Sequence, residues 1–157
     1  MRELYGEAAQ TLADGLGAQR VAIVYKDEEG KLALGGCHGF PSFSLDDSPI
    51  SVSILRDAAL EGRTILTQDG RVDHEMAQHL SLLLSGAVSI LCVPFHDANG
   101  YPAGALYADT TGRVGAFRRS ELLYARECAV WLEGLLGGSY SVPKPGLALP
   151  QDSSTVQ

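Results

Sequence analysis

Two apolar stretches joined by a short polar turn, in SILCVPFHDANGYPAGALYADT (89–110), constrain the fold more than any other part of the chain. Runs of this length and composition are typical of strands, and a polar turn containing glycine joins such strands into a hairpin. The near-continuous apolar character predicts that both strands are largely buried, with the turn at Asp97–Gly100. Pro94 and Pro102 cannot donate to a strand ladder, so we expect them near strand ends or bulges.

A second pair of runs predicts another hairpin nearer the N-terminus. RVAIVYK (20–26) is rich in β-branched residues, DEEG forms a turn, and KLALGGCHGF (31–40) leads back. RTILTQD (63–69) predicts one further short strand. Because hairpins pair their strands antiparallel, the fold class is α+β, with helices on a central antiparallel sheet.

Four segments have the apolar spacing of amphipathic helices. They are residues 3–16, a segment capped by Ser51 or Ser53 and ended by Gly62, a segment capped by Asp73 and ended before Gly86, and residues 117–136 with Ser120 as a candidate N-cap. The remaining SYSVPKPGLALPQDSSTVQ (139–157) is rich in Pro and Ser without a period. We therefore expect one folded domain over 1–138 and a flexible tail or linker over 139–157.

Charge and hydropathy exclude several function classes. The 157 residues include 12 Lys and Arg against 19 Asp and Glu, a net charge of −7. Nucleic-acid binding needs clustered basic residues, so we expect no nucleic-acid partner.

The N-terminal MRELYGEAAQTL lacks the apolar core of a signal peptide, and no apolar run approaches the roughly 18 residues of a membrane span. Three scattered cysteines, Cys37, Cys92 and Cys128, are typical of reduced thiols, so we expect a cytoplasmic protein without membrane contact.

The stretch SILCVPFHDANGYPAGALYADTTGRVGAF resembles the most recognisable part of a GAF domain. That part has a Ser-Ile strand leading into Val-Pro, a turn, and a strand with Gly-apolar-Leu-Tyr-apolar-Asp. An aromatic residue follows at the start of the last helix, as Phe117 does here. Upstream, SVSILRDAALEGRTILTQDGRVD resembles the preceding segment of the family, and the whole resemblance covers roughly Leu4 to Leu136. It is closest to GAF domains found beside forkhead-associated, cyclase or enhancer-binding activator domains in bacteria.

The resemblance implies a GAF/PAS-like fold and a regulatory or sensory role without enzymatic activity. It also implies a small-molecule pocket between the sheet and the helices above it, a homodimer through the terminal helices, and a separate output domain. By position, the candidate ligand-binding residues are His38, Phe40, Phe43, Ser53, Tyr107 and Asp109. The alternative is that the aromatic residues pack in the core and Asp109 caps a turn.

The ligand classes known in the family fit this sequence poorly. Nucleotide-binding members carry an Asn-Lys-Phe-Asp motif that is missing here. Bilin-binding members attach their chromophore through a Cys that precedes a His. Cys37-His38 matches as a dipeptide, but it lies on a predicted strand, where Cys37 would pack and His38 would face outward. We therefore expect no cofactor.

Enzymatic and metal-binding roles are also disfavoured. A GAF branch that reduces free methionine sulfoxide uses cysteines just before its Ser-x-Ile-x-Val-Pro strand, and HLSLLLSGAV contains none. DHEMAQH differs from the zinc motif His-Glu-x-x-His, because His74 and His79 are five residues apart, roughly 140° around a helix. We expect neither a catalytic residue nor a metal site.

Narrow apolar stripes on both terminal helices favour a homodimer. The candidate interface residues are Leu4, Leu12, Leu122, Ala129, Trp131, Leu132 and Leu136. Trp131 lies off the main stripe, so it anchors either a partner or the chain's own core. Two alternatives to a sensor stay open at this point: an interaction scaffold with a closed pocket, and a small redox enzyme.

Overall fold

A five-stranded antiparallel sheet is at the centre of the part of the chain that the computed structural model describes, residues 2–39, 43–69, 86–138 and 143–146. The strand order is β2-β1-β5-β4-β3. Along the chain the elements are α1 (Arg2–Leu16), β1 (Arg20–Lys26), β2 (Leu32–His38), a 3-10 turn η1 (Leu45–Asp47), α2 (Val52–Ala59), β3 (Ile65–Thr67), β4 (Ser89–His96), β5 (Pro102–Thr110) and α4 (Arg119–Leu136). The predicted α+β class is confirmed. The helix predicted from Asp73 lies outside the described residues.

Both predicted hairpins are present, and their turns are built in the same way. In β1–β2, the side chain of Asp27 accepts hydrogen bonds from the backbone N–H of Glu29 and Lys31. In β4–β5, Asp97 accepts from Asn99 and Tyr101. A glycine with positive φ, Gly30 or Gly100, completes each turn, a conformation that other residues rarely adopt. Each turn is therefore held by contacts within five consecutive residues.

Two glycines in β2 let α1 pack directly against the strand. A Cβ atom on Gly35 would lie 2.6 Å from the Tyr5 ring, and one on Gly36 would lie 2.7 Å from the Tyr5 backbone oxygen. The β1–β2 register also shifts between Ile23 and Val24. The GG pair in KLALGGCHGF is thus explained by close helix–strand contact.

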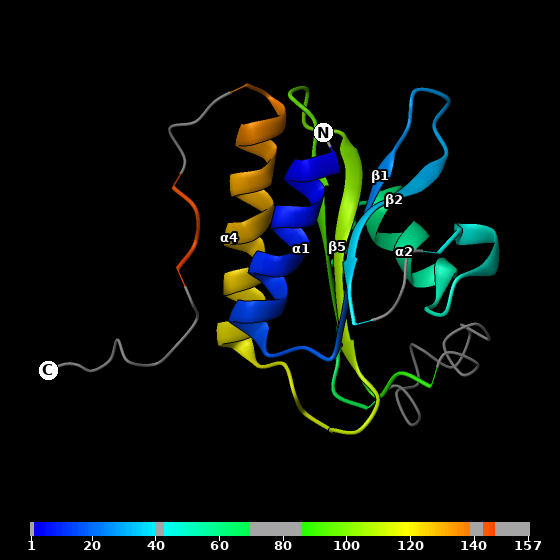
Figure 1. The fold of residues 1–157 in the computed structure, drawn as a ribbon, viewed down its shortest axis with the longest axis vertical. Helices are drawn as coiled ribbons and strands as arrows, with labels where there is room; N and C mark the ends of the chain where they lie inside the picture. The colour runs from blue at the N-terminus through cyan, green and yellow to red at the C-terminus, as the bar shows by residue number, and fades with distance from the viewer. Residues whose placement is uncertain (1, 40–42, 70–85, 139–142, 147–157) are drawn as a thin grey trace, which may run out of the picture.

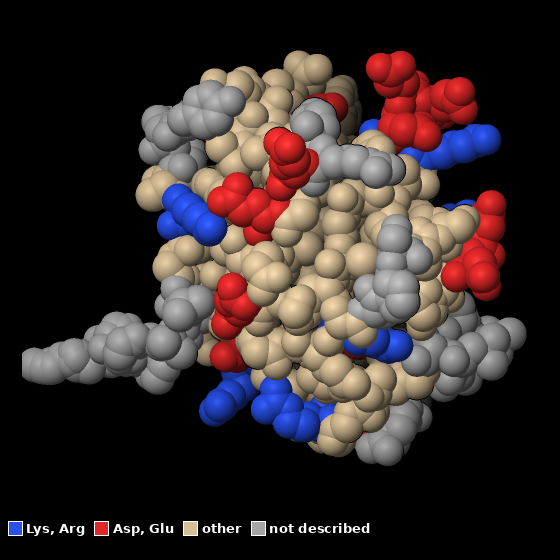
Figure 2. Space-filling view, in the orientation of Figure 1, with Lys and Arg blue, Asp and Glu red and all other residues tan. Residues whose placement is uncertain are grey.

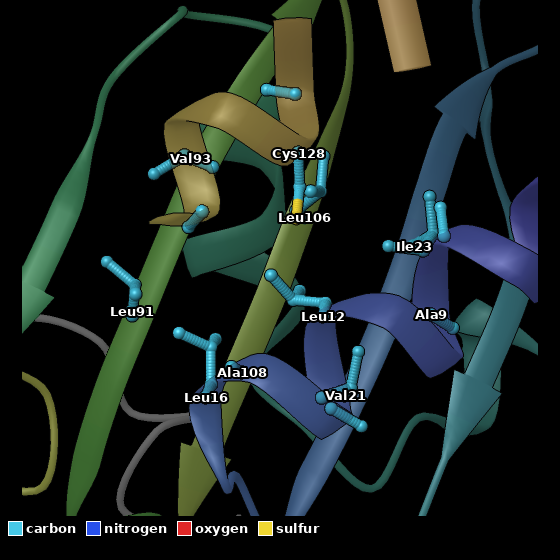
Figure 3. Close-up of a cluster of buried hydrophobic side chains, with 14 of the residues drawn as sticks. Ala9, Leu12, Leu16, Val21, Ile23, Leu91, Val93, Leu106, Ala108 and Cys128 are labelled. Atoms are coloured by element: carbon cyan, nitrogen blue, oxygen red, sulfur yellow. The ribbon is translucent and has the colours of Figure 1, made fainter. Parts of the chain in front are cut away.

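The helices cover the two faces of the sheet unequally (Figure 1). α1 and α4 lie side by side and antiparallel on one face, while α2 lies on the other. Because side chains alternate along a strand, β5 contributes Leu106 and Ala108 to the α1–α4 face and Ala105 and Tyr107 to the α2 face. Figure 3 shows the α1–α4 cluster, where Leu12 and Leu16 of α1 meet Leu106 and Ala108 of β5 beside Cys128 of α4.

The helix starts refine the sequence expectations. Ser51, rather than Ser53, caps α2, since its side chain accepts from the N–H of Ile54 at 3.3 Å. Ser120 does not cap α4. The helix begins at Arg119 after Arg118, whose backbone N–H donates to Glu121 at 2.7 Å. Phe117, directly before this point, is fully buried.

Within the described ranges, no helix combines the length and the apolar character that crossing a membrane requires.

Candidate functional site

A buried charged network occupies the α2 face at the end of β5. Arg20 and Asp109 are direct cross-strand partners on β1 and β5. Arg20 Nε donates to Asp109 Oδ1 and Nη2 donates to Oδ2, both at 2.7 Å. The hydroxyl of Tyr107 donates to the same carboxylate. Asp109 is 0% exposed and the Arg20 side chain 14%, so the network is almost entirely shielded from water.

Burial and charge fix the protonation of this network. Desolvation raises the pKa of Tyr107 well above its usual value, and the neighbouring Asp109 carboxylate raises it further. Burial alone would lower the pKa of Arg20, but the hydrogen bond and the charge of Asp109 raise it overall. Tyr107 is therefore a neutral donor and Arg20 a permanent cation. A two-point guanidinium–carboxylate pair with a further hydroxyl donor is strong and directional, and its members are already engaged with one another.

The structure brings together only some of the predicted ligand-binding residues. Tyr107 and Asp109 share one network, and Phe43 packs against the cluster that contains Tyr107. Ser53 lies in the first turn of α2, with its hydroxyl 3.2 Å from that of Ser51. Phe40 lies outside the described residues.

His38 lies apart from this group. It is exposed and pairs with Val21, whose side chain belongs to the α1–α4 cluster. Directly opposed residues share a face of the sheet, so His38 faces away from Tyr107 and Asp109. Cys37 pairs with Ala22, which belongs to the α2-face cluster. The Cys37-His38 dipeptide therefore presents its two side chains on opposite faces.

Sequence reasoning missed Arg20, which completes the network. Nothing near Arg20 in the sequence distinguishes it from other basic residues before a strand. Its partner is 89 residues away, and only the β1–β5 register pairs the two.

A second polar cluster ties the end of β3 to the start of α4. Gln68 Nε2 donates to the carbonyl of Phe117 at 2.9 Å, and the N–H of Gly115 donates back to the carbonyl of Gln68 at 3.0 Å. The buried hydroxyl of Ser89 lies 2.6 Å from the carbonyl of Arg113 and accepts from the N–H of Ala116 at 3.1 Å. These bonds couple the segment after β3 to the segment that leads into α4.

The predicted interface residues lie mostly inside the chain. Leu12, Ala129, Trp131 and Leu132 belong to the α1–α4 core, with Trp131 4% and Leu132 0% exposed. Leu122 and Leu136 pack partly against the same core, and Leu4 is half-buried. Four of the seven residues predicted for a dimer interface therefore pack in the chain's own core, and the other three are partly exposed.

The outer side of α4 instead exposes two other apolar residues, Leu123 and Val130, at 43% and 50%. They line a groove of about 590 Å³ together with Arg126, Glu127 and residues 143–146. A second cavity, of about 430 Å³, lies where the C-terminal end of α4 meets the β4–β5 turn, with Tyr25, Phe95 and the His96–Glu133 pair among its lining residues.

The three cysteines show no sign of activation. Burial raises the pKa of each thiol: that of Cys128 to about 12, that of Cys92 further, and that of Cys37 in the same direction. A nucleophilic or redox-active cysteine needs the opposite shift, toward a thiolate at neutral pH. The described environment therefore keeps all three protonated.

Comparison with solved structures places this fold among GAF domains. The GAF domain of the cyanobacteriochrome TePixJ is 18% identical, with a TM-score of 0.68 over 86% of this chain and 88% of that one. A domain of a protein described as a two-component sensor histidine kinase from Sinorhizobium meliloti is 18% identical, with a TM-score of 0.62 over 87% and 90%. Free methionine-R-sulfoxide reductase from Neisseria meningitidis is 23% identical, with a TM-score of 0.62 over 82% and 73%.

These identities establish a shared fold and nothing finer. A search of curated protein sequences found no match. The sequence profile of the GAF domain family, however, matches residues 1–151, nearly the whole chain. Together with the five-stranded sheet and its helices, this match shows that the chain belongs to the GAF domain family.

Proposed function

We propose that this chain is a regulatory GAF module without enzymatic activity, which binds a small molecule on its α2 face and acts as a homodimer through α1 and α4. The observation that carries the proposal is the hydrogen-bonded link from Gln68 to Phe117, which joins the end of β3 to the start of α4. A ligand that moves the chain near Gln68 would change these hydrogen bonds and with them the position of α4. Two α4 helices in a dimer would then pass the change to an output domain.

The outer side of α4 supports the dimer. Leu123 and Val130 are seven residues apart, two helical turns, and so lie on the same side of the helix. Both are large apolar side chains left exposed, whereas the inward residues of α4 are buried in the chain's own core. An exposed apolar stripe flanked by charged Arg126 and Glu127 is typical of a helix that packs against another helix.

The pKa directions of the thiols support a role without catalysis. The sulfoxide reductase of Neisseria meningitidis shares the fold, so the fold alone does not decide between regulator and enzyme. In this chain burial keeps Cys37, Cys92 and Cys128 protonated. An assay for reduction of free methionine sulfoxide, with dithiothreitol as reductant, is expected to give no turnover above the reductant alone. Turnover that disappears in a cysteine-free variant would overturn this part of the proposal.

Native mass spectrometry of the purified chain, under gentle and then denaturing conditions, tests ligand binding and dimerisation. A dimer whose extra mass is lost on denaturation is the expected result, and the mass difference identifies the ligand. A bare dimer would favour the interaction scaffold, with the α2 face closed by its own side chains. That alternative is supported by the Arg20–Asp109–Tyr107 network, whose members already bond to one another. A bare monomer at all concentrations would contradict the dimer.

Surface charge supports a protein or small-molecule partner over a nucleic acid. On the face shown in Figure 2, Lys and Arg side chains lie in small separate groups among acidic ones. Nucleic-acid binding depends on a continuous basic surface that neutralises several phosphates at once. The net charge of −7 points in the same direction.

A further inference from the structure

Residues Pro143–Gly146, which we call the strap, lie along the outer side of α4 (Figure 1). Lys144 makes two contacts there. Its Nζ is 3.1 Å from Glu7 Oε2 on α1 and 5.8 Å from the centre of the Trp131 ring on α4. A single side chain of the strap thus touches both helices of the α1–α4 pair.

The strap also forms one wall of the groove that contains Leu123 and Val130. Arg126 and Glu127 of α4 complete the lining. The exposed apolar stripe proposed above as the dimer contact is therefore the surface beside which the strap lies. Leu123 and Val130 stay exposed in this arrangement, but a helix packed onto them from a second chain would meet the strap as the adjoining wall of the groove.

We infer that the strap is an intramolecular occupant of the outer side of α4, and that a second copy of the chain must displace it to dimerise. This inference rests on the proposed homodimer and adds a competitor to it. In the single chain the strap covers Trp131 and neutralises Glu7. In the dimer the partner's α4 packs on Leu123 and Val130 and moves the strap out of the groove.

The strap has the properties of a weak, reversible cover. Pro143 and Pro145 each have a fixed φ, so the segment loses little conformational freedom when it lies on the helix. Its ion pair is exposed, with side chains of Lys144 and Glu7 about half accessible, and such pairs contribute little. An interface between two helices buries far more surface, so a partner can displace the strap when it is present at sufficient concentration.

The experiment uses the full chain and two readouts. Trp131 is the only tryptophan, so its fluorescence and acrylamide quenching report on cover by the strap in dilute, monomeric protein. Sedimentation equilibrium reports dimerisation. Lys144→Glu places a like charge beside Glu7, and P143G/P145G loosens the strap without changing its charge. Lys31→Glu makes the same charge change on the distant β1–β2 turn as a control.

We expect Lys144→Glu and P143G/P145G to increase quenching of Trp131 about two-fold and to tighten the dimer about two- to five-fold. Lys31→Glu should change neither quantity. Adding Glu7→Lys to Lys144→Glu should restore both values toward those of the unmodified chain, since the ion pair is re-formed with reversed polarity.

The two readouts separate the possible failures. Unchanged Trp131 quenching in both strap variants would overturn the strap's position on α4, whatever the oligomeric state. Increased quenching with an unchanged or weaker dimer would overturn the competition. A chain that stays monomeric in every variant, at every concentration, would overturn the homodimer and the competition together, while the quenching data would still report where the strap lies.

Discussion

The two faces of the sheet are stabilised in different ways. Between the sheet and α1–α4, the buried side chains are almost all apolar and are fixed by close packing. On the α2 face, Tyr107 lies among apolar neighbours but bonds to Asp109, which in turn pairs with Arg20. Apolar contacts have no preferred direction, whereas a two-point ion pair fixes both partners to one geometry. The α1–α4 face is thus held by broad apolar packing, and the α2 face holds the directional contacts.

Asp109→Asn tests the directional contacts and has the largest expected effect. Removing the negative charge leaves the guanidinium of Arg20 largely buried without its counter-ion. Breaking one partner of a buried ion pair costs about 3–5 kcal/mol, at the lower end here because Arg20 keeps some access to water. Urea unfolding measures the change. Asp47→Asn, at an exposed position of η1, is the matched control, expected to stay within about 0.5 kcal/mol. Equal effects at the two positions would remove the distinction between the faces.

Leu132→Ala tests the apolar packing on the α1–α4 face. Leu132 is fully buried between α4 and the sheet, so truncation removes apolar contacts and leaves a cavity. Such substitutions cost about 2–5 kcal/mol. Val130→Ala, two residues away but on the exposed side of the same helix, should cost well under 1 kcal/mol in the monomer. Thermal unfolding of dilute protein measures both. If Val130→Ala were the more damaging of the two, our assignment of the inward side of α4 would be wrong.

Alkaline pH is expected to lower the stability of the folded chain through groups on both faces. Burial raises the pKa of Tyr107 and Cys92 on the α2 face and of Tyr124 and Cys128 on the α1–α4 face. A group whose pKa is higher in the folded chain than in the unfolded chain contributes to the stability of the folded chain. The whole contribution is present at pH values below the pKa of the group in the unfolded chain. That advantage is lost as pH rises from about 9 for the thiols and 10 for the tyrosines toward the folded values. Each such group removes about 1.4 kcal/mol per pH unit.

The measurement is urea unfolding at a series of pH values between 8 and 11. Tyr107→Phe removes one titrating group, so its stability should fall less steeply above pH 10 than that of the unmodified chain. Parallel curves for the two proteins would show that Tyr107 does not titrate on unfolding in this range.

Ser51→Ala has the smallest expected effect of the four. The hydroxyl of Ser51 caps α2 by accepting from the N–H of Ile54, and losing such a cap costs about 1 kcal/mol. Ser53→Ala, at the second position of α2, should cost less, since the N-cap of the helix is Ser51. The two variants can be compared by the midpoint of thermal unfolding. A larger loss for Ser53→Ala would mean that the capping role belongs to Ser53.

Local features of the fold were predictable from the sequence, and long-range features were not. The hairpins follow from the turn residues at Asp27–Gly30 and Asp97–Gly100, which act within a few positions of themselves. The partner of Asp109 depends on the β1–β5 register, which no short stretch encodes. The face of His38 likewise depends on its pairing with Val21.

The orientation of α4 was predictable only in part. Its sequence carries apolar residues on more than one side, and periodicity alone does not say which side meets the sheet. The structure places Trp131 and Leu132 inward and Leu123 and Val130 outward. The start of the helix was missed by two residues because a backbone bond to Glu121 from Arg118, rather than a serine side chain, caps it.

The two matched turns, at Asp27–Lys31 and Asp97–Tyr101, have a consequence for the order of folding. In each, the Asp N–H donates to the carbonyl four residues later, and the glycine N–H donates back to the Asp carbonyl. Hairpins closed by such short loops form in about 1–10 μs. The pairing of β1 with β5 must instead close a loop of nearly ninety residues, as the separation of Arg20 and Asp109 shows. We therefore expect two preformed hairpins to dock in a slower step, in which high contact order sets the rate and the Arg20–Asp109 pair forms last.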